Sequence, residues 1–371
     1  MTARITPHAI GMTEVAPGRH MGWASFGDES GDPVFWFHGT PGARSQLPHD
    51  IDAAAYDARL RIIGVERPGT GDSSEYLYSN VAEFARDLLK VADDLGIESF
   101  GCVGLSGGGP YLLAVAHEAP HRMKAGVVLG GIGPTRGPDA VLSHTMLLVP
   151  AATLINSIRQ PLARCLSAAV RSATPFADPM VKLFFGLMPG DRAEFNSRPH
   201  DLDQFTHDLI HAVQRTGIAA AVDDLILFGR DWGFKLGDIR VPITFYGGSS
   251  DVIVPYLHAE RQAKRVPNGR LRTLDGRGHF AGYTDPEGVL NDIRDNWPIG
   301  SEGSRVQPTS VKLAAAKPAA KKPAAKKASA TRTAASTAKK PAAKKPAAKK
   351  PAAKKPAAKK ASATSGSNRR S

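Results

Sequence analysis

Hydrophobic and polar positions follow two different periods over the first 300 residues. Six short, mostly apolar runs have the length of buried strands: residues 33–37, 60–65, 100–105, 124–129, 241–246 and 270–274. Apolar side chains recur at the spacing of one helix face in four further segments: residues 81–95, 110–118, 257–266 and 287–297. Strands that alternate with helices predict an α/β fold, with a mostly parallel sheet covered by helices on both faces.

The alternation breaks between residues 135 and 232, where the chain has helix-like segments and no convincing strand. The sequence therefore predicts four regions: a first part of the sheet domain at 1–134, a helical cap at 135–232, a second part of the sheet domain at 233–300, and a tail at 301–371. A helical insertion of this length is expected to lie over the strand ends as a lid. Its apolar runs at 142–155 and 184–188 are expected to face either the core or a substrate, with most of them packed against the core.

The tail at 301–371 differs in composition from the rest of the chain. It carries 20 lysines and arginines against one acid, a net charge of +19, whereas the whole chain carries +13 and the first 300 residues therefore −6. The sequence Pro-Ala-Ala-Lys-Lys recurs, and a proline every five residues prevents a continuous α-helix. Because the tail has no aromatic residues to form a core, it is predicted to be disordered.

Pairs of lysines on such a segment are suited to a polyanionic partner. They neutralise phosphates and release counterions, so binding is expected to be independent of sequence and to weaken with salt. DNA is the expected partner, RNA and acidic membrane surfaces satisfy the same physics, and a tail that only solvates the chain is the alternative. The predicted contact residues are the paired lysines: Lys321, Lys322, Lys326, Lys327, Lys339, Lys340, Lys344, Lys345, Lys349, Lys350, Lys354, Lys355, Lys359 and Lys360.

Cysteine usage and apolar segments limit the class of protein further. Only Cys102 and Cys165 occur, which argues against a disulfide framework and a zinc site, and Cys102 is expected to pack in the core. Residues 1–8 lack the apolar run of a signal peptide, and the longest apolar stretch, near 146–155, is too short to cross a bilayer. We expect a cytoplasmic protein without a transmembrane segment, associated with the nucleoid where the tail binds DNA.

The sequence Gly104-Leu105-Ser106-Gly107-Gly108 lies between the strand predicted at 100–105 and the helix predicted at 110–118. A serine on such a strand-to-helix turn adopts a strained backbone conformation, and Gly104 and Gly108 leave room for the crowded turn. Its hydroxyl is then held open at the end of the sheet, as a nucleophile requires. A glycine-rich loop with an incidental serine is the alternative.

Ser106 needs a base to take its proton and an acid to orient that base. The best acid is Asp251 and the best base is His279, because each follows a predicted strand and catalytic groups collect at strand ends in open α/β sheets. Asp251 could instead be a loop carboxylate or a helix cap. Asp275 is a rival acid, but it precedes His279 by four residues on the same connection. Asp223 and Asp224 are expected to cap or solvate a helix of the insertion.

An oxyanion hole requires backbone N–H groups aimed at the developing negative charge. One N–H is expected from Gly107, directly after the nucleophile. The other is expected from Thr40, since the loop that follows the strand at 33–37 reads His38-Gly39-Thr40-Pro-Gly and proline has no N–H. Gly39 permits the tight turn, and His38 is expected to fix the loop by hydrogen bonds.

Residues 1–300 resemble the α/β-hydrolase superfamily. The motifs that carry the resemblance span nearly all of this region: residues 38–42, 66–73, 104–109, 242–255 and 278–279. The resemblance implies Ser106 as nucleophile, Asp251 as acid and His279 as base, with neither a metal nor an organic cofactor. The tail is similar to the lysine-, alanine- and proline-rich tails of linker histones and of actinobacterial histone-like proteins.

The resemblance also argues against several activities that are known in this superfamily. Relatives that dehalogenate or open epoxides carry aspartate where this chain has Ser106. Prolyl aminopeptidases usually have tryptophan soon after the serine, whereas this chain has glycine at 107–109. Cofactor-free haloperoxidases often have methionine beside the serine, and Leu105 and Gly107 do not match that pattern. The leading hypothesis is a serine hydrolase that cleaves an ester or related acyl bond of a small apolar substrate. Thioesterase, amidase, carbon–carbon hydrolase and acyltransferase activities remain open, as does a nucleic-acid-binding protein that uses the hydrolase fold as a scaffold or ligand sensor.

Overall fold

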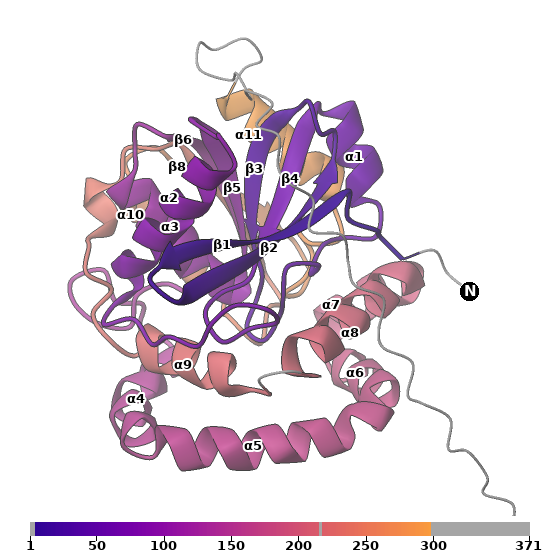
Figure 1. The fold of residues 1–371 in the computed structure, drawn as a ribbon, viewed down its shortest axis with the longest axis vertical. Coiled ribbons are helices and arrows are strands. Elements are labelled where there is room, and N and C mark those ends of the chain that lie inside the picture. Colours follow the sequence, from indigo (N-terminus) through magenta and orange to yellow (C-terminus); the bar gives the residue numbers. More distant parts are fainter. Residues whose placement is uncertain (1–3, 215–216, 298–371) are drawn as a thin grey trace, which may run out of the picture. The chain divides into compact units, whose positions relative to one another are not determined.

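A single sheet of eight strands organises the part of the chain that the computed structural model describes, residues 4–214 and 217–297 (Figure 1). Its strands are β1 (Ala9–Ala16), β2 (Arg19–Gly27), β3 (Asp32–Phe37), β4 (Leu60–Val65), β5 (Phe100–Leu105), β6 (Met123–Leu129), β7 (Ile243–Gly248) and β8 (Gly269–Leu274). They lie in the order β1-β2-β4-β3-β5-β6-β7-β8. β2 is antiparallel to both of its neighbours, and the six strands from β3 to β8 are parallel to one another. The predicted mostly parallel sheet is confirmed.

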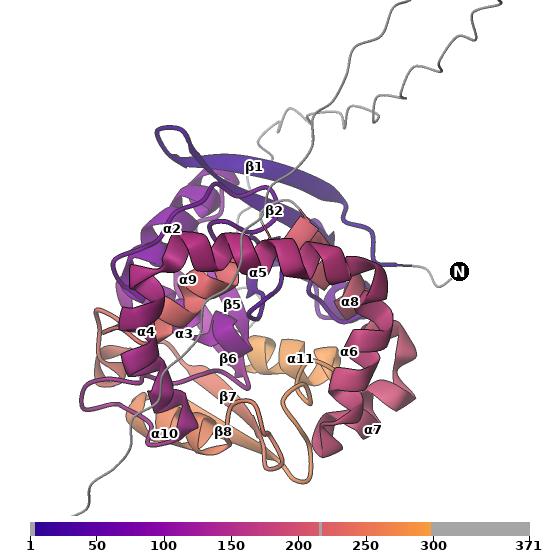
Figure 2. The same ribbon diagram turned by 90° about the horizontal axis from the view of Figure 1, so that it is seen from below.

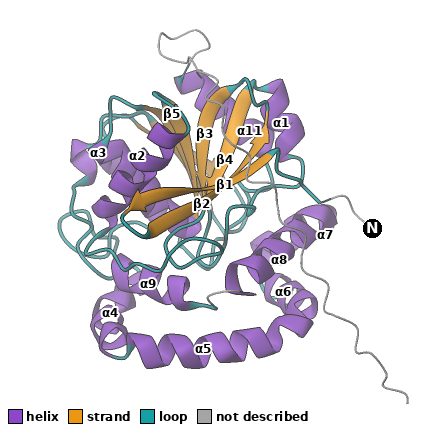
Figure 3. Cartoon of the chain, in the orientation of Figure 1, coloured by secondary structure: helices purple, strands orange, loops and turns teal. Residues whose placement is uncertain are grey.

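Helices cover both faces of the sheet, as predicted (Figures 1 and 3). The helices α1 (Ile51–Asp57) and α11 (Pro286–Asn296) contribute to one buried apolar cluster, and the helices α2 (Phe84–Asp94), α3 (Gly109–Glu118) and α10 (Leu257–Arg265) contribute to another. Each strand in the middle of the sheet is buried on both faces, which explains why its sequence is a continuous apolar run. Cys102 packs in the core, as expected.

Six α-helices occupy the described part of the connection between β6 and β7: α4 (Leu148–Ser157), α5 (Arg159–Ala173), α6 (Ala177–Gly186), α7 (Pro189–Ser197), α8 (Pro199–Gln214) and α9 (Ala219–Phe228). No described residue of this connection lies in a strand, so its predicted helical character is confirmed. Figure 2 shows α5 running from α4 towards α6 along the outer side of the insertion. No described helix is long and apolar enough to span a bilayer.

The expectation that the apolar runs of the insertion pack mostly against the core is wrong for several residues. Leu147, Leu154 and Leu187 are 70%, 65% and 74% exposed, whereas Ala152 and Phe185 are buried. The outer helices have a single packed face, so the leucines on the other face remain in solvent.

The register of the parallel strands aligns their carboxyl ends. Phe37 of β3 is paired with Gly104 of β5, and Leu129 of β6 is paired with both Leu105 of β5 and Tyr246 of β7. Gly248 at the end of β7 is paired with Leu274 at the end of β8. Residues that follow these strands therefore meet at one edge of the sheet, although more than two hundred positions separate the first from the last.

The buried carboxylate of Asp208 links α8 to the segment after β3. Its two oxygens accept hydrogen bonds from the backbone N–H groups of Ala43 at 2.8 Å and Ser45 at 3.0 Å. Burial, with a smaller contribution from the nearby carboxylate of Glu66, raises the pKa of Asp208 to about 7, while His211 acts in the opposite direction. The ionised carboxylate is therefore disfavoured in the folded chain.

Replacing Asp208 with asparagine is expected to change how stability depends on pH. A carboxyl whose pKa is higher in the folded than in the unfolded chain stabilises the fold at low pH, and this stabilisation disappears as pH rises from about 4 to 7. At about 1.4 kcal/mol per pKa unit, the change is up to roughly 4 kcal/mol. Urea unfolding at several pH values should show this decline in the wild type and not in Asp208→Asn. Asp203→Asn, an exposed position on the same helix, should behave as the wild type.

Candidate active site

Ser106 stands directly after β5 in a left-handed backbone conformation, with φ of 53°. Its flanking glycines are required by close backbone contacts. A Cβ on Gly104 would lie 2.8 Å from the carbonyl oxygen of Gly108, and a Cβ on Gly108 would lie 2.3 Å from that of Phe37. The turn continues into α3, so the serine hydroxyl is presented at the carboxyl edge of the sheet, with the conformation that the motif predicts.

His279 and Asp251 form a buried hydrogen-bonded pair at the same edge. The Nδ1 of His279 lies 2.7 Å from Oδ2 of Asp251, and both side chains are almost completely buried. The other oxygen of Asp251 accepts hydrogen bonds from the N–H groups of Ile253 and Val254, each at 2.8 Å. Asp251 is therefore both a loop carboxylate and the partner of the imidazole, whereas the rival acid Asp275 is exposed.

Two residues without a predicted role position His279. Asp191 in α7 accepts hydrogen bonds from the backbone N–H groups of His279, at 3.0 Å, and Phe280, at 2.7 Å. Burial raises the pKa of Asp191, and these two hydrogen bonds oppose the increase. Gly130, with φ of 55°, approaches the ring so closely that a Cβ there would lie 3.0 Å from Nδ1 of His279. Gly130 directly follows a predicted strand, and this position could have indicated that it belongs to the site. Nothing in the local sequence distinguished Asp191.

The loop after β3 lies against the turn of Ser106. A Cβ on Gly107 would lie 2.2 Å from Oγ1 of Thr40, so the two predicted donors of the oxyanion hole belong to adjacent segments. The N–H of Gly39 donates to Oε1 of Gln46 at 2.6 Å. In His38, Nδ1 lies 2.8 Å from the carbonyl oxygen of Gly39. Burial and the nearby guanidinium of Arg67 lower the pKa of His38 well below its ordinary value, so the ring is neutral and fixes the loop by hydrogen bonds.

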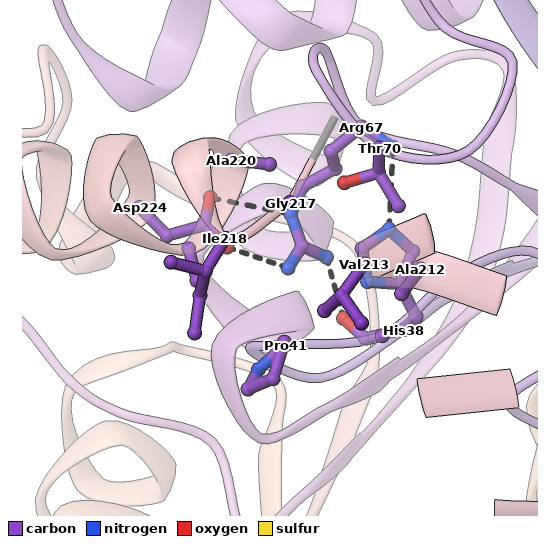
Figure 4. A pocket seen from close by; sticks show the side chains of 12 residues that line it. His38, Pro41, Arg67, Thr70, Ala212, Val213, Gly217, Ile218, Ala220 and Asp224 are labelled. Atoms are coloured by element: carbon purple, nitrogen blue, oxygen red, sulfur yellow. Dashed lines mark hydrogen bonds and ion pairs between the residues drawn. The ribbon is translucent and has the colours of Figure 1, made fainter. Parts of the chain in front are cut away.

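A buried ion pair between Arg67 and Asp224 lies beside this loop (Figure 4). The guanidinium lies 2.6 Å from Oδ2 of Asp224 and donates to the carbonyl oxygens of His38, at 2.5 Å, and Gly39, at 2.8 Å. The same carboxylate accepts hydrogen bonds from the hydroxyls of Thr40 and Tyr111, each at 2.5 Å. One carboxylate from the insertion thus holds the loop, the arginine and α3 together.

The expectation that Asp223 and Asp224 cap or solvate a helix is wrong. Asp224 is buried in the network of Arg67, and Asp223 forms an ion pair with Arg159 of α5. Both acids lie within α9 and not at its N-terminus, so neither occupies a capping position. Their partners are distant in the sequence, which is why local pattern did not reveal them.

A cavity of about 340 Å³, which we call the active-site cavity, opens at Ser106. Its polar end contains Thr40, Gln46, Ser106 and His279, and its walls are apolar side chains of α6, α8 and the segments after β7 and β8: Met180, Val181, Phe184, Phe185, Phe205, Leu209, Ile253 and Phe280. None of the described residues that line it is acidic. A reactive group at one end of an apolar space suits an uncharged substrate with an apolar body.

The arrangement of sheet, turn and cavity has counterparts among known proteins. A sequence model of the alpha/beta hydrolase fold matches residues 32–286. The chain belongs to the α/β-hydrolase family. The hydrolase is 31% identical over 317 residues to a Streptomyces coelicolor protein named "Probable proline iminopeptidase", covering 77% of this chain and 94% of that one.

Solved structures agree on the fold. The esterase RhEst1 from Rhodococcus sp. ECU1013 superposes with a TM-score of 0.57 at 18% identity, over 77% of the hydrolase and 98% of the esterase. A bromoperoxidase from Bacillus anthracis superposes with a TM-score of 0.56 at 20% identity, over 77% of the hydrolase and all of that chain. At such identities the likeness shows the fold alone. The hydrolase is an enzyme of this family, and its tail lysines lie outside the described residues.

Proposed function

We propose that the hydrolase is a serine esterase that cleaves an ester or related acyl bond of a small apolar substrate. Ser106 would be the nucleophile, His279 the base and Asp251 the acid. The observation that carries the proposal is the buried His279–Asp251 pair, whose imidazole lines the same apolar cavity as Ser106. Because Nδ1–H donates to Asp251, Nε2 is left as the acceptor that a serine nucleophile needs.

In the proposed reaction, Nε2 of His279 takes the proton of Ser106 as Oγ attacks the acyl carbon. The backbone N–H groups of Thr40 and Gly107 would stabilise the negative charge on the carbonyl oxygen. The imidazolium then gives its proton to the departing alcohol, leaving an acyl-enzyme. A water molecule, deprotonated by His279, hydrolyses the acyl-enzyme and restores the serine.

The residues that line the active-site cavity help to distinguish an esterase from the alternative hydrolase activities. An aminopeptidase must hold the ammonium group of its substrate, and burying an ammonium without an acidic partner is costly. No described residue of the active-site cavity offers a carboxylate, so the name of the Streptomyces relative does not extend readily to this chain. Thioesters, amides and carbon–carbon bonds place the same demands on the serine as esters do, and they stay within the proposal.

The basic tail is proposed to have a function separate from catalysis. We infer that residues 301–371 bind polyanions, DNA foremost, through the net charge of +19, and hold a cytoplasmic enzyme at the nucleoid. The helical insertion would serve as a lid over the active-site cavity, since α6 and α8 supply much of its wall.

A fluorophosphonate probe tests the central claim, because it labels only an activated serine. The full chain is expected to be labelled, and Ser106→Ala is expected to lose the label while remaining folded by circular dichroism. A chain shortened to residues 1–300 should keep the label and lose retention on immobilised DNA at low salt. If the folded full chain is not labelled and still binds DNA, the esterase proposal fails and a scaffold that binds nucleic acid gains support.

A further inference from the structure

A second cavity of about 200 Å³, which we call the side chamber, lies within the insertion beside the active-site cavity. Its wall is formed by side chains of α5, α6 and α8, with Pro41 and Ile218. Among the described residues of the wall, only Thr174 has a hydroxyl, and that hydroxyl donates to the carbonyl oxygen of Val170. The chamber therefore offers apolar surface and no free polar group from its described lining, which suits a hydrocarbon and not a polar ligand.

The side chamber and the active-site cavity share four lining residues, which form the junction between them: Pro41, Met180, Val181 and Leu209. One of these, Met180, has an unbranched side chain with several rotatable bonds, so it can move aside for a narrow chain. A straight hydrocarbon attached to a carbonyl group at Ser106 would pass this junction and continue between α5, α6 and α8. A short acyl group would end before it.

The position of the side chamber relative to His279 and Thr40 indicates which part of a substrate enters it. The departing alcohol must receive a proton from His279, so it lies on the side of that imidazole. His279, Ile253 and Phe280 line the active-site cavity and do not line the side chamber. The chamber instead adjoins Pro41, which follows the predicted oxyanion donor Thr40. The acyl chain, on the opposite side of the carbonyl carbon from the alcohol, is the part that points into the chamber.

We propose that the side chamber binds the distal part of a linear, medium-length acyl chain and that the hydrolase selects medium-chain acyl esters over acetyl esters. This inference rests on the proposed esterase function and specifies its substrate class. Each methylene group that enters the chamber should raise kcat/KM about fourfold, the gain expected from burying one such group. The gain should stop where the chamber ends, and branched or aromatic acyl groups should not share it.

The test compares p-nitrophenyl acetate, hexanoate and decanoate on the full chain and on variants that fill the chamber. Ala177→Phe and Ala173→Phe place a ring in the side chamber, at positions that do not line the active-site cavity. Both are expected to lower the decanoate-to-acetate ratio of kcat/KM by about tenfold or more, because several methylene groups lose their place, and to leave acetate within about twofold. Ala168→Phe, at an exposed position of α5, is the matched control and should keep the wild-type ratio.

Equal kcat/KM for decanoate and acetate in the wild type would overturn the inference, and so would an equal loss of both in the two filled variants. Binding separates this inference from the esterase proposal. Decanoic acid should bind the Ser106→Ala chain at least about tenfold more tightly than butanoic acid by calorimetry, and Ala177→Phe in the same background should abolish the difference. If the wild type hydrolyses no ester but binds decanoic acid more tightly than butanoic acid, the esterase proposal fails and the proposal that the side chamber binds an acyl chain is supported. Absence of the preference refutes the chamber.

Discussion

Replacing Asp251 with asparagine is expected to lower kcat about ten-thousandfold, although the substitution is nearly isosteric. Oδ1 of Asp251 accepts two backbone hydrogen bonds, from Ile253 and Val254, while Oδ2 faces Nδ1 of His279. In the variant the amide oxygen is required at the first position, so the amide NH₂ must face the imidazole. Since that NH₂ can only donate, Nδ1 becomes an acceptor and the ring proton moves to Nε2. The base is then in the wrong tautomer to accept a proton from Ser106.

The measurement is kcat for a p-nitrophenyl ester, together with the midpoint of urea unfolding to show that the variant is folded. Asp275→Asn is the control, because this exposed carboxylate precedes His279 on the same connection, whereas the Nδ1 of His279 faces Asp251. It should retain wild-type kcat. A kcat for Asp251→Asn within tenfold of the wild type, or an equal loss in Asp275→Asn, would contradict the role of Asp251 in the proposed mechanism.

The strands that position the candidate site were predictable because parallel strands in the middle of a sheet are buried on both faces. β4 and β5 coincide with their predicted runs, and β3, β6 and β8 differ by one residue at one end. The strands β1 and β2 were not predicted. β1 lies at the edge of the sheet, and its pattern includes the exposed side chains of Ile10 and Met12, so it has no continuous apolar run. α1 has only seven residues, too few to establish a helical period.

The chemistry of the candidate site was predictable where it depended on turns. Around Ser106 the chain needs glycine because a Cβ on Gly104 would meet the backbone of Gly108 and a Cβ on Gly108 would meet that of Phe37. This requirement leaves a glycine pattern in the local sequence even where the contacting residue is distant. The buried network was not predictable, because its specificity comes from tertiary structure. Arg67 and Asp224 are 157 positions apart. Arg67 lies in the motif at 66–73, but no local feature of either residue identifies the other as its partner.

Asp224→Asn is expected to destabilise the hydrolase by about 3–5 kcal/mol, the usual effect of removing one partner of a buried ion pair. The side chain of Arg67 is only 3% exposed, so its charge cannot be solvated when the carboxylate is neutralised. The hydroxyls of Thr40 and Tyr111 donate to different oxygens of Asp224, and the asparagine amide retains only one of these two acceptors. For a protein of this size the melting temperature should fall by roughly 10 °C.

The neighbouring acid provides a matched control for this effect. Asp223 also lies in α9 and also pairs with an arginine, but Arg159 is 20% exposed and retains contact with water. Asp223→Asn is therefore expected to destabilise the hydrolase less than Asp224→Asn does. If Asp223→Asn and Asp224→Asn destabilise equally in urea unfolding, the burial of Arg67 is not the cause.

A double replacement separates the stability of the network from its effect on the loop. Arg67→Met combined with Asp224→Leu removes both charges and fills their space, which is expected to recover most of the stability lost in Asp224→Asn. Catalysis should not recover, because the carbonyl oxygens of His38 and Gly39 lose the guanidinium that binds them and Thr40 loses its acceptor. The test measures urea unfolding and kcat for the wild type, Asp224→Asn and the double variant. Full recovery of kcat in the double variant would show that the ion pair stabilises the fold without positioning the predicted oxyanion donor.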